Sequence, residues 1–237
     1  MDRDAFRGLH RLQVLSIHSN HIRRIENGTF RDLRKLKKLY LFTNFVEKIN
    51  QDTFAGLSQV ETVFLHENLL RLLPEGTFVS LSKLKVLTLY RNYIGTLLTR
   101  SLIGLNQTRE LYLYENKIER IQKGAFKGVP MLQVLHLGNN YLADLTYDSY
   151  DGLTNLLELN LDNNRIHTLD ASMFQTIPHL RKLVLLGNRI TELKPGNSFH
   201  WGFGVFKINS GTFLSLCVIS YDNRRRPSSS VIETFSE

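Results

Sequence analysis

The chain has 237 residues, of which 42% are hydrophobic, and it carries a formal net charge of +8. This apolar content excludes a disordered chain, and the length is sufficient for one or two globular domains. The single cysteine, Cys217, excludes an intramolecular disulfide framework and a zinc cluster built on cysteines. The N-terminal residues lack the apolar stretch of a signal peptide, and no apolar run reaches the ~18 residues that a membrane span needs.

An asparagine recurs every 24 residues, without insertion, up to residue 188. Each one ends a stretch of the pattern L-x-L-x-x-N, as in LYLFTN at 39–44 and LYLYEN at 111–116. A fixed internal period of this length is the signature of a solenoid, in which each repeat is one structural unit. We expect these asparagines to form a structural ladder in which their amides bond the backbone of the turns. The ladder is Asn20, Asn44, Asn68, Asn92, Asn116, Asn140, Asn164 and Asn188.

Each repeat predicts one short strand, because leucines at alternate positions place two apolar side chains on one face. Stacked strands would form a parallel sheet over a leucine core, with a phenylalanine such as Phe54 closing the far wall. Leu102 and Tyr150 replace this phenylalanine, and Thr108 replaces the first leucine, which indicates either tolerated variation or a kink. The predicted solenoid covers 1–194, a partial repeat followed by eight repeats that begin near 12, 36, 60, 84, 108, 132, 156 and 180. Residues 195–237 are expected to be a degenerate tail, partly disordered.

This pattern resembles the leucine-rich repeat family over residues 1–194, and its 24-residue period is similar to the "typical" extracellular class. That class includes Toll-like receptors, Slit-type guidance proteins and small matrix proteoglycans. The resemblance implies an α/β repeat solenoid, a horseshoe with a parallel β-sheet on the concave face and irregular or short helical segments on the convex face. It also implies an extracellular or cell-surface location, with the cytoplasm as the alternative, and no cofactor. Extracellular members carry cysteine-rich caps that are missing here, so we expect a piece of a longer ectodomain or a truncated gene model.

The variable residues beside the leucines predict a binding surface. Side chains alternate across a strand, so these residues face away from the core, on the concave side. In the middle repeats they are aromatic or histidine, which favours an interaction site, although strand propensity alone is an alternative explanation. We expect a protein ligand here, in the signalling, adhesion or innate immune role that the family resemblance implies. The predicted ligand-binding residues are Tyr40, Phe42, Phe64, His66, Tyr90, Arg91, Tyr112, Tyr114 and His136.

Basic residues gather near the N-terminus, where the first 48 positions hold eleven Lys or Arg against five acids. The densest stretch is a candidate polyanion site, with a solvated rim as the alternative. Its residues are Arg34, Lys35, Lys37 and Lys38. A sulfated glycan bound there would indicate an extracellular matrix protein, and a cytosolic scaffold is a third alternative. Nucleic acid is not expected as a partner, because no recognition helix or RNA-binding motif is present.

Asn27 and Asn106 begin the sequons NGT and NQT and are therefore glycosylation candidates. The motifs of P-loop, α/β-hydrolase and zinc-protease chemistry are missing from the sequence, so we do not expect an enzyme. His18 and His66 are two repeats apart, roughly 10 Å by strand spacing, which is too far to share a metal ion. We therefore expect no metal site.

Overall fold

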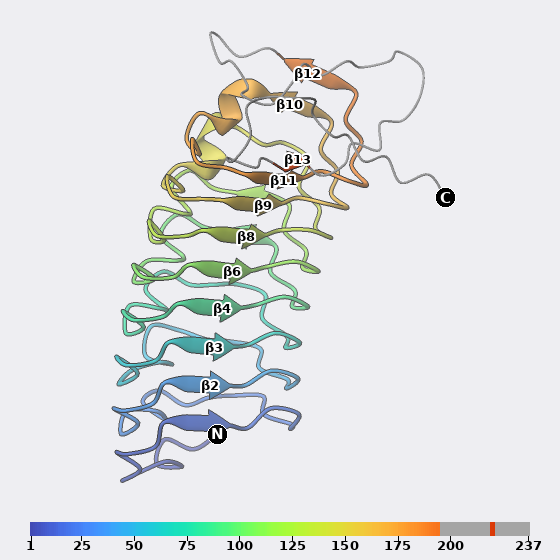
Figure 1. Ribbon diagram of the computed structural model, residues 1–237. Coiled ribbons are helices and arrows are strands. Elements are labelled where there is room, and N and C mark those ends of the chain that lie inside the picture. The colour runs from blue at the N-terminus through green and yellow to red at the C-terminus, as the bar shows by residue number, and fades with distance from the viewer. Residues whose placement is uncertain (195–218, 221–237) are drawn as a thin grey trace.

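The computed structural model describes residues 1–194 and 219–220. Short strands stack one above another along the chain and form a nine-stranded sheet (Figure 1). In sheet order the strands are β1 (Val14–Ser16), β2 (Lys38–Tyr40), β3 (Thr62–Phe64), β4 (Val86–Thr88), β6 (Glu110–Tyr112), β8 (Val134–His136), β9 (Glu158–Asn160), β11 (Lys182–Val184) and β13 (Ile219–Ser220).

From β1 to β11 every strand pairs in parallel with the strand one repeat further along the chain. Leu39, the middle residue of β2, lies between Leu15 of β1 and Val63 of β3. These middle residues are buried, so a slip of one residue would turn each of them to solvent. The predicted parallel-strand repeat solenoid is confirmed.

The return segments on the side opposite the sheet contain little regular structure. They include two four-residue 3₁₀ helices, η1 (Tyr147–Tyr150) and η2 (Ala171–Phe174). Two small parallel sheets pair β5 (Thr96–Leu97) with β7 (Arg120–Ile121), and β10 (Thr168–Asp170) with β12 (Glu192–Lys194). Elsewhere in 1–194 the return segments are turns, bends and extended chain, so this side of the solenoid is mostly irregular.

A row of large side chains closes the core opposite the sheet. Phe30, Phe54, Phe78, Leu102, Phe126 and Tyr150 are all fully buried in it. Thr108 is buried as well, and its hydroxyl donates a hydrogen bond to the Leu84 carbonyl at 3.0 Å. The parallel register continues unbroken from β4 through β6 and β8 to β9, so these substitutions are tolerated variations in the repeat.

Beyond the eighth repeat, β13 pairs antiparallel with β11, with Ile219 opposite Leu183. This strand lies in the segment that the sequence predicts to be a degenerate tail, and it covers the sheet edge that β11 would otherwise present. The rest of the tail, including Cys217 and the expected disorder, lies outside the described residues. The boundary of the solenoid at residue 194 stays a prediction.

Within residues 1–194 and 219–220, no helix is long and apolar enough to cross a membrane. The same residues hold no group of three or more His, Cys, Asp or Glu side chains arranged to bind a metal ion.

Candidate functional site

The asparagine ladder fixes the loops that follow the sheet strands. Asn44 donates its Nδ2 hydrogens to the carbonyls of Ile17 and Leu41, both at 3.0 Å, and its Oδ1 accepts the backbone amide of Ile22 at 3.0 Å. The same bonds recur at every ladder residue from Asn68 to Asn188. Each asparagine thus joins its own turn to the preceding repeat. Asn20, at the first turn, is exposed and bonds two carbonyls of its own repeat.

The residue before each ladder asparagine has a left-handed backbone. From Ser19 to Asn163 its φ lies between 49° and 56° in seven successive repeats, and Gly187 continues the series at 68°. A left-handed conformation is unfavourable for residues other than glycine, by roughly 1–2 kcal/mol. The ladder hydrogen bonds hold the chain in this conformation, which ends the strand sharply and places residues such as Arg91 beside the sheet.

Five rings stack on the sheet face opposite the core, one from each of five consecutive repeats. They are His18, Phe42, His66, Tyr90 and Tyr114, which we call the ring stack. Neighbouring ring centroids lie 4.1–4.6 Å apart, and the planes are within 13° of parallel. Adjacent strands are about 4.8 Å apart, so planar rings at equivalent positions meet face to face. The interior rings therefore present their edges, and not their faces, to solvent.

A second row of rings stands on the strands themselves. Tyr40 and Phe64 are 5.0 Å apart, and the rings of Tyr112 and His136 meet edge to face at 5.1 Å. Thr88 separates these two pairs and is buried. The two rows together bring all the predicted aromatic and histidine residues onto one surface.

His66 differs from the exposed contact residue that the sequence predicts. Only 9% of its surface is exposed, and its Nδ1 lies 2.7 Å from the Thr88 hydroxyl. Burial lowers the pKa of His66 to about 4, so the ring is neutral within the stack at physiological pH. His18, which was not among the predicted binding residues, is exposed at the first position of the ring stack. Its place could have been found from the 24-residue spacing to Phe42.

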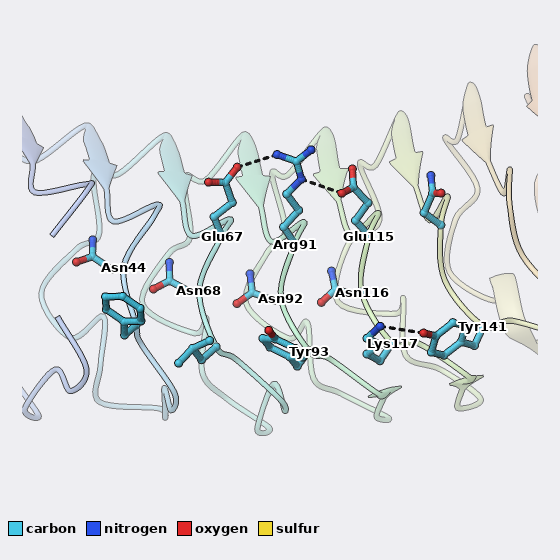
Figure 2. Close-up of a pocket in the computed structure, with 13 residues that line it drawn as sticks. Asn44, Glu67, Asn68, Arg91, Asn92, Tyr93, Glu115, Asn116, Lys117 and Tyr141 are labelled. Atoms are coloured by element: carbon cyan, nitrogen blue, oxygen red, sulfur yellow. Dashed lines mark hydrogen bonds and ion pairs between the residues drawn. The ribbon is translucent and has the colours of Figure 1, made fainter. Parts of the chain in front are cut away.

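A network of ion pairs follows the ring stack by one residue in each of three repeats. Figure 2 shows its members Glu67, Arg91 and Glu115. The guanidinium of Arg91 bonds Glu67 at 3.0 Å on one side and Glu115 at 2.8 Å on the other. Glu67 also accepts the Thr43 hydroxyl at 2.9 Å. The hydrogen bonds from Arg91 and Thr43 hold the pKa of Glu67 below its usual value. Sequence reasoning included Arg91 and missed Glu67, although both carboxylates are 24 residues from Arg91.

A shallow groove of about 530 Å³ runs along this network, and Glu67, Arg91 and Glu115 are among the residues that line it (Figure 2). The ladder asparagines separate the network from a second row of side chains, to which each repeat contributes one residue. In this row Phe45 and Tyr93 are 41% and 48% exposed. At its far end Lys117 donates to the Tyr141 hydroxyl at 2.8 Å, and the guanidinium of Arg165 stacks 4.1 Å from the centre of the Tyr141 ring. Sequence reasoning did not assign these residues to the site.

The hydroxyls of Tyr112 and Tyr114 on the sheet face remain protonated at physiological pH. Burial and the carboxylate of Glu110 raise the pKa of Tyr112 to about 12, and its hydroxyl donates to Glu110 at 2.9 Å. Burial and the neighbouring Tyr90 raise the pKa of Tyr114 to about 12. Burial would raise the pKa of Glu158, but bonds from Lys182 and His136 outweigh it and lower that pKa. The face therefore combines neutral donors with ionised carboxylates.

The candidate polyanion residues Arg34, Lys35, Lys37 and Lys38 are all exposed. Lys38 belongs to β2 and lies on the sheet face with the aromatic rows, and the other three precede that strand. None of the four forms an ion pair with another described residue.

The sequon asparagines Asn27 and Asn106 are exposed as well. The threonines of the two sequons, Thr29 and Thr108, are buried, and each donates its hydroxyl to a backbone carbonyl.

The sequence profile described as "Leucine rich repeat" matches residues 1–46, 42–94, 59–118, 107–166 and 154–200. The chain belongs to the leucine-rich repeat family. No curated protein matches it. Among solved structures, the solenoid is similar to the crystal structure of the TLR13–ssRNA13 complex, with a TM-score of 0.75 and 24% sequence identity. That alignment covers 83% of this chain and 31% of the other, so the chain spans about a third of that protein and the likeness concerns the fold. The predicted resemblance to the leucine-rich repeat family is confirmed, and the solved structure that shares the fold is that of a Toll-like receptor.

One expectation about partners of this leucine-rich repeat protein is wrong. Nucleic acid was not expected as a partner, because the chain lacks a recognition helix and an RNA-binding motif. The TLR13–ssRNA13 complex shows that a solenoid of this fold occurs together with single-stranded RNA. The missing motifs do not exclude nucleic acid here, because a leucine-rich repeat presents its variable side chains on a sheet and does not need a helix to do so.

Proposed function

We propose that this leucine-rich repeat protein is a recognition module that binds a protein ligand on the concave sheet face, as part of an extracellular receptor. The ring stack and the second ring row are the observation that carries the proposal, since together they pave six consecutive repeats. Tyrosine offers a large contact area, a hydroxyl and few rotatable bonds, which makes it a favoured interface residue. Apart from the exposed His18 and the buried His66, these rings are partly exposed. A contiguous aromatic patch at a protein surface marks an interaction site.

The arrangement of the rings favours a protein ligand over stacked bases on this face. Proteins that bind single strands without sequence preference stack bases on free ring faces. In the ring stack the faces of Phe42, His66 and Tyr90 are already covered by neighbouring rings. The exposed ring edges and the tyrosine hydroxyls suit side-chain packing and hydrogen bonding instead.

The test replaces Tyr90 and Tyr112 together by alanine in the full chain. Partners are first selected with the unaltered protein from a library of purified extracellular domains. We expect the double variant to lose at least about tenfold in affinity, because tyrosines central to an interface are often worth more than 1.4 kcal/mol each. Circular dichroism monitors the fold. A matched variant, with Phe45 and Tyr93 replaced by alanine, removes two exposed rings outside the sheet. Unchanged binding of the Tyr90 and Tyr112 variant, or an equal loss in the control, would contradict the concave-face site.

An extracellular or cell-surface location is part of this proposal, and the cytoplasm is the alternative. The exposure of Asn27 and Asn106 supports it, because a glycan can be accommodated only where the asparagine is accessible. The protein expressed through the secretory route should lose mass on treatment with an N-glycosidase. The loss should shrink when either asparagine is changed to glutamine. An unchanged mass would leave the location without this support.

A second candidate function is polyanion binding at the N-terminal end of the sheet. Four exposed cations without an ionic partner among the described residues support it, because such clusters attract sulfate or phosphate groups. Retention is measured on immobilised heparin and on single-stranded RNA. Changing Arg34, Lys35, Lys37 and Lys38 to glutamine should reduce retention and flatten its salt dependence. Retention on heparin alone would indicate a sulfated glycan, and retention on RNA at physiological salt would indicate nucleic acid. Equal retention of the variant on both would remove this candidate.

A further inference from the structure

The ring stack ends at Tyr114, because the equivalent residue of the next repeat is Gly138. In the repeat after that, the equivalent residue is Asp162, and its carboxylate leans over the Gly138 backbone. A Cβ atom at Gly138 would collide with the Asp162 Oδ1 atom. The far side of the Tyr114 ring therefore faces a position that lacks a ring, and the Asp162 carboxylate covers the buried Gly138 backbone at the base of that position.

We propose that this position binds the guanidinium group of an arginine side chain from the protein ligand, stacked on Tyr114 and hydrogen-bonded to Asp162. The inference rests on the proposed function and specifies the chemistry of one subsite on the concave face. A planar cation suits this position, since it can lie against an aromatic ring while its edge donates to a carboxylate.

The solenoid itself shows that a guanidinium fits at this spacing. Arg91 places its guanidinium between Glu67 and Glu115, which belong to the repeats on either side, at 3.0 and 2.8 Å. Arg165 stacks on the ring of Tyr141, one repeat away, at 4.1 Å. The Gly138 position combines one neighbour of each kind, the Tyr114 ring in the preceding repeat and the Asp162 carboxylate in the following one. Because glycine supplies no side chain, the guanidinium must come from another molecule.

The surrounding charges favour a cation. Asp162 accepts a hydrogen bond from the neutral Asn163 amide at 2.9 Å, and no cation of the described residues pairs with it. Glu110 accepts the Tyr112 hydroxyl and forms no ion pair with another described residue, so it adds negative charge to this part of the sheet. Glu115 and Glu158 are paired with Arg91 and Lys182. This field attracts a guanidinium and opposes the phosphate of a nucleotide.

Arginine fits better than lysine for geometric reasons. The guanidinium is planar, so it can stack on Tyr114, and its fork of N–H groups can donate two hydrogen bonds to one carboxylate. A lysine ammonium is a strongly hydrated point charge that can do neither.

The test uses the full ¹⁵N-labelled chain and the peptide acetyl-Gly-Arg-Gly-amide. We expect saturable shifts of the Gly138 amide signal, with affinity in the roughly millimolar range of a small single-site ligand. The peptide with citrulline in place of arginine keeps the shape and removes the charge, and it should bind at least about fivefold more weakly. Asp162→Asn and Tyr114→Leu should each reduce arginine binding by a similar factor. Asp144→Asn changes an exposed carboxylate after the Asn140 turn and should leave binding unaltered.

A further variant, Gly138→Ala, tests the site without removing a binding group. The added methyl group must displace the flexible Asp162 carboxylate, so arginine binding should fall while the spectrum elsewhere is unchanged.

Three results would overturn the inference. The citrulline peptide could bind as well as the arginine peptide, Asp162→Asn could leave binding unaltered, or guanosine monophosphate could shift the Gly138 signal when arginine does not. The last result would assign the position to a nucleobase. If arginine fails to bind while loss of Tyr90 and Tyr112 still abolishes ligand capture, the subsite fails and the proposed function stands. The reverse pattern would retain an arginine site and remove the proposed concave-face interface.

Discussion

Replacing Asn116 by alanine tests the role of the asparagine ladder directly. Asn116 is 3% exposed and makes four bonds. Its Nδ2 donates to the carbonyls of Leu89 and Leu113 at 3.0 Å and of Tyr114 at 3.3 Å, and its Oδ1 accepts the backbone amide of Ile94 at 3.1 Å. Alanine removes all four bonds without disturbing the leucine core, so the change isolates the polar contribution.

The expected cost follows from which groups are left without a partner. The Leu89 carbonyl keeps a bond from Asn92, and the Leu113 carbonyl keeps one from Asn140, both at 3.0 Å. The Ile94 amide keeps no acceptor among the described residues. A buried unsatisfied donor costs about 1–3 kcal/mol, and the weakened carbonyl bonds add a fraction of this, so we expect a loss of about 2–4 kcal/mol.

Urea unfolding of the full chain, followed by circular dichroism, measures this loss. The matched control is Asn20→Ala, because Asn20 is exposed and its Oδ1 accepts no backbone amide among the described residues. That variant should lose less than about 1 kcal/mol, the usual range for an exposed hydrogen bond. Equal losses at the two positions would refute the argument, since the difference rests entirely on the buried Ile94 amide.

Two further predictions concern buried side chains. The hydroxyl of Tyr150 has no hydrogen-bond partner among the described residues, and burial raises its pKa. Replacing Tyr150 by phenylalanine should therefore stabilise the chain by about 1 kcal/mol in the same urea assay. A loss of stability would instead indicate that the hydroxyl has a hydrogen-bond partner. The pKa of His66 is about 4 in the folded chain and about 6.5 when unfolded, so the unfolded state binds more protons between these values. The urea midpoint should therefore fall as the pH drops from 6.5 towards 4, and His66→Phe should flatten this fall; an equal slope in the variant would place the titration elsewhere.

The sequence alone was sufficient to predict the solenoid, because every repeat carries leucines and an asparagine at the same positions. Leucines at alternate positions demand a buried strand face, and the ladder asparagine satisfies the turn that follows. The sequence was less informative about the return segments, which were expected only to be irregular or short helical and which are mostly turns, bends and extended chain within 1–194. No strict pattern governs those segments, since several backbone paths close the same core.

The candidate site shows the opposite balance. The sequence located the aromatic residues of the sheet face, because strand alternation alone decides which side chains point outward. It could not show that Thr88 and His66 are buried by their neighbours, or that Asp162 leans over Gly138. These features depend on contacts between residues 24 positions apart, and such residues meet only after the repeats have stacked about 4.8 Å from one another. Local chemistry therefore determined the scaffold. The tertiary structure decided which rings stack, which charges pair and where the ring stack is interrupted.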